Sequence, residues 1–118
     1  MTVTDAKILT AETVPAYLDG HMDKIDLPNK DNIKWTATTI QGGNVNYAFC
    51  CKDEASGQTV FLKQAPEFVA VFGPDGFPLT SERMQQEMDV YAEWKTLLGD
   101  ELAAKYLPKI HFFDSKYY

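Results

Sequence analysis

The residues of this chain with the clearest chemical potential are the adjacent glycines Gly42 and Gly43, followed by Asn44 and Asn46. Glycine has no Cβ and readily adopts positive φ, so a turn of this kind can bring backbone N–H groups close to phosphate oxygens. A hairpin turn also needs glycine for its backbone conformation alone. The turn by itself therefore leaves a phosphate-binding loop and an ordinary turn both open.

Lys63 is the second candidate, near the end of a strand-like run at residues 59–64. Alternation along a strand places Phe61 and Lys63 on one face and Val60 and Leu62 on the other. Burying a lysine on a mainly apolar strand is costly unless an opposite charge pairs with it. The alternative interpretation is a lysine that simply faces solvent.

Glu87 is the third candidate, and it borders an apolar helical stripe that contains Met84 and Met88. From there it can lean toward Lys63. The alternative is a surface ion pair with Arg83 one helical turn earlier, worth about 0.3 to 0.5 kcal/mol. A Gly-rich turn, a strand lysine and a helical glutamate occur in this order in protein kinases, where the lysine contacts the α and β phosphates and the glutamate holds it.

Three strands are expected to position the glycines and the lysine. Residues 34–40 and 45–51 are rich in β-branched and aromatic side chains on either side of the glycines, and residues 59–64 resume the pattern after a polar turn. The short connections predict an antiparallel meander. After Pro108, the apolar residues 109–113 are predicted to form a fourth strand.

A helix over residues 80–98 is expected to position Glu87, with Thr80 as its N-cap and Gly99 as its C-cap. Residues 100–106 are compatible with a further helical turn. A short helix near the N-terminus is predicted to begin at Thr10, with Pro15 in or just after its first turn. The stripe predicted to face the core consists of Met84, Met88, Tyr91, Trp94 and Leu98.

Composition indicates one globular domain over residues 1–118, with a net charge of -6 from 11 basic and 17 acidic residues. Such a charge disfavours nucleic acid as a partner. No apolar run approaches the roughly 20 residues that span a bilayer, so no membrane partner is expected. The start lacks signal-peptide features, and the neighbouring Cys50 and Cys51 are predicted to be unpaired thiols, so we expect a cytoplasmic protein.

No catalytic residue and no metal ligand is predicted within this chain. His21 and His111 have no cysteine or carboxylate partner at metal-ligand spacing. No Ser-His-Asp or Cys-His arrangement is arguable either. The residues alone leave the Gly42-Gly43 turn, Lys63 and Glu87 as the candidates for contact with a phosphate.

From about Leu9 to Asp114, the chain resembles the N-terminal lobe of the 5-methylthioribose kinase family, which has a protein-kinase-like fold. The resemblance rests on residues 63–65 (Lys-Gln-Ala), 77–83 (Phe-Pro-Leu-Thr-Ser-Glu-Arg), Glu87, and the Leu-Pro-Lys-Ile sequence at 107–110. The chain departs from the family at Gln41 and Gly42, where the loop usually begins Gly-Asp, and at Phe77, where tryptophan is usual. It resembles a divergent member. By position, the resemblance implies that the cofactor-binding residues are Gly42, Gly43, Asn44, Asn46, Lys63 and Glu87.

The resemblance implies an α+β fold: a twisted antiparallel sheet with one long packed helix and a short N-terminal helix. It implies that the intact enzyme binds ATP and magnesium and transfers the γ-phosphate to the 1-hydroxyl of 5-methylthioribose, in methionine salvage. It places the base and the magnesium ligands in a C-terminal lobe, which these 118 residues do not contain. We therefore do not expect this chain to be active without such a lobe.

A second functional hypothesis is a stand-alone lobe that acts as a binding or scaffolding subunit without catalysis. In that case a protein partner would cover the exposed face of the lobe. The resemblance also implies a possible homodimer for the intact enzyme. Whether the chain is an enzyme thus depends on whether it is part of a longer one.

Overall fold

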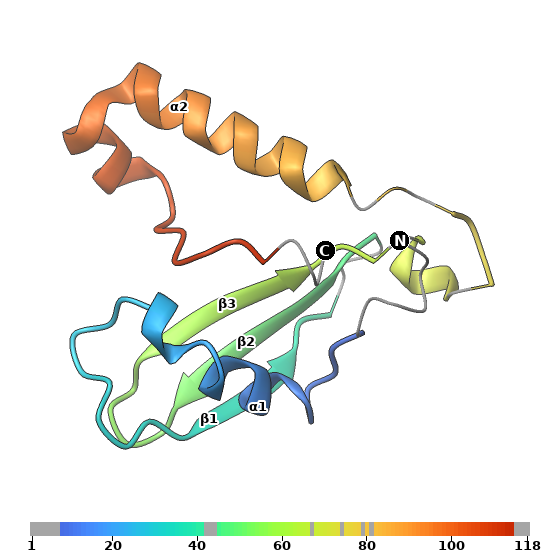
Figure 1. Cartoon of the computed structure of the whole chain (residues 1–118), viewed down its shortest axis with the longest axis horizontal. Helices are drawn as coiled ribbons and strands as arrows, with labels where there is room; N and C mark the ends of the chain where they lie inside the picture. Colours follow the sequence, from blue (N-terminus) through green and yellow to red (C-terminus); the bar gives the residue numbers. More distant parts are fainter. Residues whose placement is uncertain are drawn as a thin grey trace.

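The protein has an α+β fold, in which a three-stranded antiparallel sheet is combined with one long helix and several short ones (Figure 1). The structure, a computed structural model, describes residues 8–41, 45–66, 68–73, 75–78, 80 and 82–114. The predicted fold class is confirmed.

The sheet consists of β1 (Trp35–Thr39), β2 (Tyr47–Asp53) and β3 (Thr59–Gln64), in the order β1-β2-β3. In the antiparallel register, Cys51 of β2 lies opposite Ala37 of β1 and Val60 of β3. The predicted meander is confirmed. β3 lies at one edge of this sheet, so its outer side has no neighbouring strand among the described residues.

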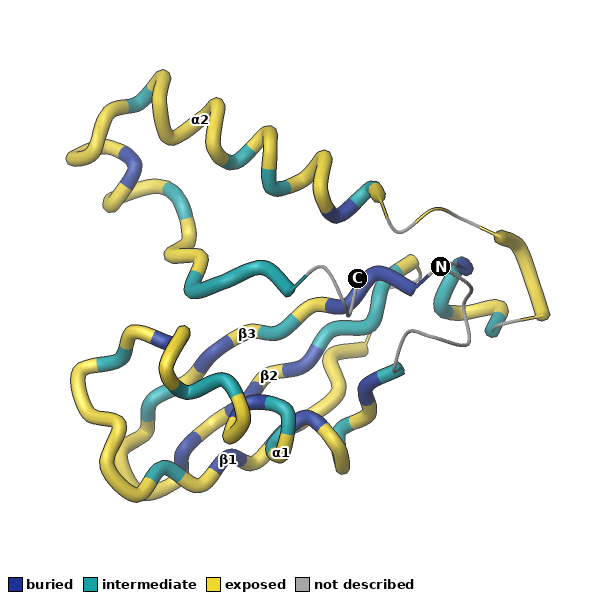
Figure 2. The backbone as a smooth tube through the Cα atoms, in the orientation of Figure 1, coloured by how far each residue is buried: buried dark blue, intermediate teal, exposed yellow. Residues whose placement is uncertain are grey.

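One face of the sheet carries the hydrophobic core. α1 (Val14–Asp19) and the 3₁₀ helix η2 (Met22–Lys24) cover this face (Figure 1), and Val14 and Leu18 of α1 are fully buried against Phe49 and Cys51 of β2. Most of the buried tube in Figure 2 accordingly lies in the strands and the segments that cover them. Val60 of β3 faces this core. Because side chains alternate along a strand, Phe61 and Lys63 lie on the opposite, open face of the sheet.

The N-terminal helix is as short as predicted but begins later than Thr10. Thr13 is its N-cap, and Thr10 instead forms a preceding turn whose backbone carbonyl accepts hydrogen bonds from the N–H groups of Thr13 (3.0 Å) and Val14 (2.9 Å). The Thr10 N–H donates to Thr13 Oγ1 at 2.8 Å. The two threonines thus satisfy each other's backbone N–H groups in a turn that leads into the helix.

The long helix α2 (Glu82–Tyr106) is interrupted at Gly99, whose φ of 80° and ψ of 165° are not helical. Residues 82–98 and 100–106 therefore form two helical stretches, as the sequence predicted. At the start of α2, the Thr80 hydroxyl accepts a hydrogen bond from the Glu82 N–H at 3.2 Å, consistent with its predicted capping role. The connection from β3 contains the 3₁₀ helix η3 (Ala70–Phe72).

The apolar stripe of α2 enters the core only at its first turn. Met84 is 8% exposed, whereas Trp94 is 53% exposed, so the prediction that Trp94 is a core residue is wrong. α2 reaches the sheet near its own N-terminal end, and most of the helix is exposed beyond β3 (Figures 1 and 2). Trp94 has no sheet surface to pack on there.

The predicted fourth strand at residues 109–113 is also wrong, because these residues form an extended segment without strand pairing. Side chains hold this segment instead of a backbone ladder. The Tyr91 hydroxyl on α2 donates to the Pro108 carbonyl at 2.6 Å, and Phe112 packs against the hydrophobic core. Pro108 has no N–H to offer a strand neighbour.

Candidate functional site

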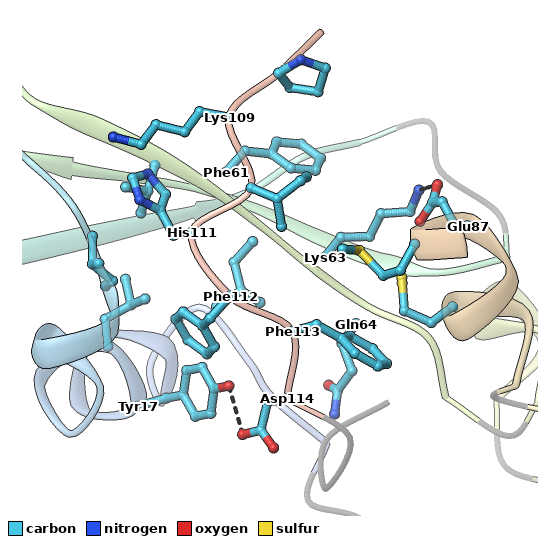
Figure 3. Close-up of a pocket in the computed structure, with 18 of the residues that line it drawn as sticks. Tyr17, Phe61, Lys63, Gln64, Glu87, Lys109, His111, Phe112, Phe113 and Asp114 are labelled. Carbon is cyan, nitrogen blue, oxygen red and sulfur yellow. Dashed lines mark hydrogen bonds and ion pairs between the residues drawn. The ribbon is translucent and has the colours of Figure 1, made fainter. Parts of the chain in front are cut away.

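Lys63 and Glu87 form an ion pair on the open side of β3. The Lys63 Nζ atom lies 2.6 Å from Glu87 Oε1, with the two side chains 34% and 52% exposed (Figure 3). Lys63 extends from the strand face that also carries Phe61, as alternation predicts, and Glu87 reaches it from the second turn of α2. Both charges remain accessible to solvent, so a ligand can reach the ammonium group.

A cavity of about 480 Å³ adjoins this pair, between β3, the first half of α2 and the segment at residues 108–114 (Figure 3). Its volume falls in the range of about 300 to 1,000 Å³ that is usual for small-molecule sites. The lining is mainly apolar, with the charged pair at one end, and includes Phe61, Leu62, Met88, Tyr91, Ile110 and Phe112. This arrangement can hold a flat apolar group next to an anionic one.

A second polar link between α2 and the sheet lies one helical turn before Glu87. Arg83 donates from Nε and Nη2 to the Asn46 side-chain oxygen, at 3.1 and 2.8 Å. Its Nη1 atom donates to the Thr80 carbonyl at 2.6 Å, and Nη2 also lies 3.4 Å from the Val45 carbonyl. Burial lowers the pKa of the Arg83 guanidinium, which nevertheless stays charged at neutral pH.

At the far end of the cavity, Tyr17 of α1 and His21 just after it contact the segment at residues 108–114. The Tyr17 hydroxyl donates to Asp114 Oδ2 at 2.9 Å (Figure 3). His21 Nε2 lies 3.7 Å from the same oxygen. The His21 ring stacks on Phe112 at a centroid distance of 5.4 Å. These contacts keep the segment beside β3 although it forms no strand.

An exposed ion pair adds a further contact at the other end of this segment. Lys109 Nζ lies 2.5 Å from Asp26 Oδ2, and this contact lowers the pKa of the Asp26 carboxyl. Burial lowers the pKa of His111, whose Nδ1 accepts a hydrogen bond from the Asp26 N–H at 3.1 Å. A solvent-exposed pair of this kind contributes little to stability.

The structure brings together three of the six predicted cofactor-binding residues. Lys63 and Glu87 are paired, and Asn46 lies at the start of β2, bound to Arg83 of the same helix. Gly42, Gly43 and Asn44 lie outside the described residues, so the predicted loop stays a prediction. The alternative ion pair of Glu87 with Arg83 is replaced by the contacts of each side chain with the sheet.

Arg83 and Gln64 have positions at this site that sequence reasoning did not assign. Gln64 is 1% exposed, and its Oε1 atom accepts a hydrogen bond from the Leu9 N–H at 2.8 Å. Both residues belong to the stretches that carry the family resemblance, so that resemblance was the available signal. Residue type alone does not show which backbone or side chain a long polar group will contact.

In the portions of the chain that the structure describes, no group of three or more His, Cys, Asp or Glu side chains could hold a metal ion. No helix among the same residues combines the length and the apolar character needed to cross a bilayer.

Comparison with known proteins finds a similarity between this chain and a kinase. A methylthioribose kinase from Escherichia coli O45:K1 (strain S88 / ExPEC) is 28% identical over 108 residues. The match covers 92% of this chain and 24% of that kinase, so the chain spans about a quarter of the length of its relative. No protein-family profile matches the chain. The chain thus has a distant and partial similarity to a kinase.

Proposed function

We propose that this chain is the ATP-binding lobe of a small-molecule kinase of the methylthioribose kinase type. The observation that supports it most is the pairing of Lys63 with Glu87 beside the apolar cavity. A strand lysine held by a helical carboxylate is the arrangement that kinases of this fold use to contact the α and β phosphates. The similarity to a methylthioribose kinase agrees with this proposal.

In this proposal each described residue has a limited task. Lys63 offers an ammonium group to the phosphates, and Glu87 fixes the direction in which that ammonium points. The apolar cavity wall, with Phe61 and Tyr91, holds the base of the nucleotide. Gly42, Gly43 and Asn44 would cover the phosphates, as the sequence predicts. The acceptor of the intact enzyme would be the 1-hydroxyl of 5-methylthioribose.

The transfer step itself is not assigned to this chain. In kinases of this fold a carboxylate base and the magnesium ligands come from a second lobe. The described residues offer positioning for phosphates and a cavity for the base. Magnesium, when bound in the intact enzyme, would neutralise charge on the phosphates during transfer, and none of the residues described here is assigned to hold it.

The affinity of the chain for ATP tests this proposal. Charge-assisted hydrogen bonds to an ionised group contribute about 1.5 to 3 kcal/mol, so Lys63→Ala should weaken ATP binding by about tenfold to a hundredfold. Titration calorimetry or NMR at millimolar nucleotide measures this change. Lys95→Ala is the matched control, because Lys95 is an exposed lysine on α2 and does not line the cavity. Equal ATP affinity of the wild-type, Lys63→Ala and Lys95→Ala proteins would refute the proposal.

A second candidate function is a binding or scaffolding subunit without catalysis. The observation that favours it is exposed apolar surface: Trp94 is 53% and Leu97 is 73% exposed on α2, and the outer edge of β3 has no strand neighbour among the described residues. Surfaces of this kind are suited to association with another protein. The two functions differ in whether Lys63 matters for nucleotide binding.

A further inference from the structure

The helix α2 is connected to the sheet by two polar links on the same side of the helix. Arg83 contacts Asn46 at the start of β2, and Glu87 contacts Lys63 on β3. Residues four apart lie one above the other on a helix. Between these two links, Met84 is the one buried residue in this part of α2. The position of Glu87 relative to Lys63 therefore depends on how the first turn of the helix is held.

Arg83 links the first turn of α2 to Asn46, and we call these hydrogen bonds of Arg83 the clamp. Its guanidinium donates twice to one acceptor on the sheet, Asn46 Oδ1, and once to the Thr80 carbonyl at the beginning of its own helix. An amide oxygen is the only part of an asparagine side chain that can accept hydrogen bonds, so the contact fixes the orientation of the Asn46 side chain. The Val45 carbonyl, 3.4 Å from Nη2, also accepts from the Ala70 N–H at 3.1 Å.

The pairing of β2 with β3 connects the residue that Arg83 contacts to Lys63. Asn46 directly precedes β2, in which Tyr47 pairs with Gln64 and Ala48 pairs with Lys63 of β3. The anchoring point of Arg83 and the strand position of Lys63 are thus neighbours across one antiparallel pair. By contrast, the far half of α2 is largely exposed and gives the helix little further support.

We propose that Arg83 is a positioning residue: by holding the first turn of α2 against the start of β2, it sets the place where Glu87 meets Lys63. In this proposal the side-chain oxygen of Asn46 serves the clamp. The inference deepens the proposed function, because a displaced Glu87 would leave the Lys63 ammonium free to turn away from a bound phosphate. The contacts of Arg83 themselves are all made within the chain.

The first test needs no nucleotide. In protein with ¹³C-labelled lysine, the Lys63 side-chain signal is compared between wild type, Glu87→Gln, Arg83→Gln and Gln86→Ala. Arg83→Gln should move the signal toward its position in Glu87→Gln, because the ion pair loosens. Gln86→Ala, an exposed change on the same helix, should leave it in place. A Lys63 signal in Arg83→Gln that coincides with wild type would overturn the clamp.

Conservative variants separate positioning from a loss of folding. Asn46→Asp keeps an oxygen acceptor for the guanidinium and should retain the wild-type Lys63 signal, whereas Asn46→Ala should behave like Arg83→Gln. Arg83→Lys keeps the charge without the two-pronged donor geometry and should restore the signal only in part. If Asn46→Asp and Asn46→Ala change the Lys63 signal equally while both remain folded, the proposed contact does not position the pair.

Nucleotide binding gives the second readout. Arg83→Gln should weaken ATP binding by about fivefold to tenfold, less than the loss of Lys63 itself, because the ammonium group remains and only its orientation is loosened. It should leave adenosine binding unchanged. If the wild-type chain binds no ATP while the lysine signal moves as expected, the proposed function fails and the clamp stands. If ATP binds through Lys63 and Arg83→Gln binds it as wild type does, the clamp fails and the proposed function stands.

Discussion

At the scale of single residues, charged side chains in this protein occur both in a half-exposed ion pair and in a buried hydrogen-bonded position. Lys63 and Glu87 meet in a half-exposed position, where both remain available to a ligand. Asp53 at the end of β2 is 3% exposed and is instead fully engaged with its neighbours. Its Oδ2 atom accepts from the Ser56 hydroxyl at 2.6 Å, and its Oδ1 atom accepts from the Lys34 N–H at 3.2 Å.

Asp53 should make the stability of the protein depend on pH. The hydrogen bond from the Ser56 hydroxyl, followed by those from backbone N–H groups, lowers the pKa of the Asp53 carboxyl below its ordinary value of 3.8. A carboxyl whose pKa is lowered by folding stabilises the folded state above its unfolded pKa, about 3.9, and this stabilisation is lost as the pH falls through the lower folded pKa. The contribution is therefore complete at neutral pH.

Asp53→Asn removes one acceptor and should lower Tm at pH 7 by about 3 to 6 °C. Thermal unfolding followed by circular dichroism at pH 7 and at pH 3 measures the difference from wild type, which should shrink at the lower pH. Glu54→Gln is the control, since Glu54 is an exposed neighbour with only a 3.8 Å contact to Lys52. A difference of the same size at both pH values would show that the carboxylate charge contributes nothing.

At the scale of elements, the interruption of α2 at Gly99 redirects the chain toward the cavity. Gly99 has a φ of 80°, a conformation that side chains other than glycine rarely adopt. The stretch at 100–106 then turns back, and residues 107–114 return to β3 (Figure 1). One backbone conformation thus places Ile110 and Phe112 in the cavity wall.

Gly99→Ala should cost about 1 to 2 kcal/mol of the free energy of unfolding, because the backbone conformation is strained for alanine. No atom lies within 4 Å of a Cβ placed there, so the cost comes from the backbone and not from a clash. Gly20→Ala is the matched control, because Gly20 has a φ of -75° and a Cβ there would make ordinary contacts. Urea unfolding of both variants measures the effect. An equal stability change in the two would contradict the assigned role of Gly99.

The elements differ in how well the sequence predicted them, for physical reasons. The three strands were predictable because alternation, β-branched residues and short polar turns all agree there. The extended run at 109–113 has the same composition, but strand formation also needs a neighbour for the backbone groups, which composition does not reveal. Trp94 fits the helical periodicity equally well, and whether a sheet lies beneath it is a property of the tertiary structure.

The sequence likewise predicted only some of the contacts at the candidate site. Lys63 and Glu87 could be predicted as partners because their order along the chain resembles that of kinases. The contact between Arg83 and Asn46 could not be predicted, because it depends on where the first turn of α2 meets the start of β2. Long polar side chains reach several possible partners from one backbone position, and only the packing of the elements selects one.

At the scale of the whole molecule, the two sides of the sheet are unequally covered. α1 and η2 bury one face, while on the other Phe61 is 63% exposed. Trp94 and Leu97 on α2 are exposed as well, and β3 lies at the edge of the sheet. Exposed apolar area beside an edge strand favours association between molecules.

The chain should therefore associate as its concentration rises, through the exposed side of α2. Sedimentation equilibrium from about 5 to 500 µM, a range that brackets weak association, should show an increasing mean mass for the wild type. A variant with both Trp94→Glu and Leu97→Lys should stay monomeric, and Glu93→Gln on the same helix should behave as wild type. A wild-type protein that remains monomeric throughout would remove the support for the scaffolding function.

The proposed function depends on whether Lys63 contacts the phosphates of a nucleotide. The most direct measurement is the NMR signal of the ¹³C-labelled Lys63 side chain, identified by its loss in Lys63→Arg, during titration with ATP and with adenosine. We predict that ATP shifts the Lys63 signal progressively and that adenosine leaves it near its starting position. A Lys63 signal that does not move while ATP saturates the protein would contradict the account.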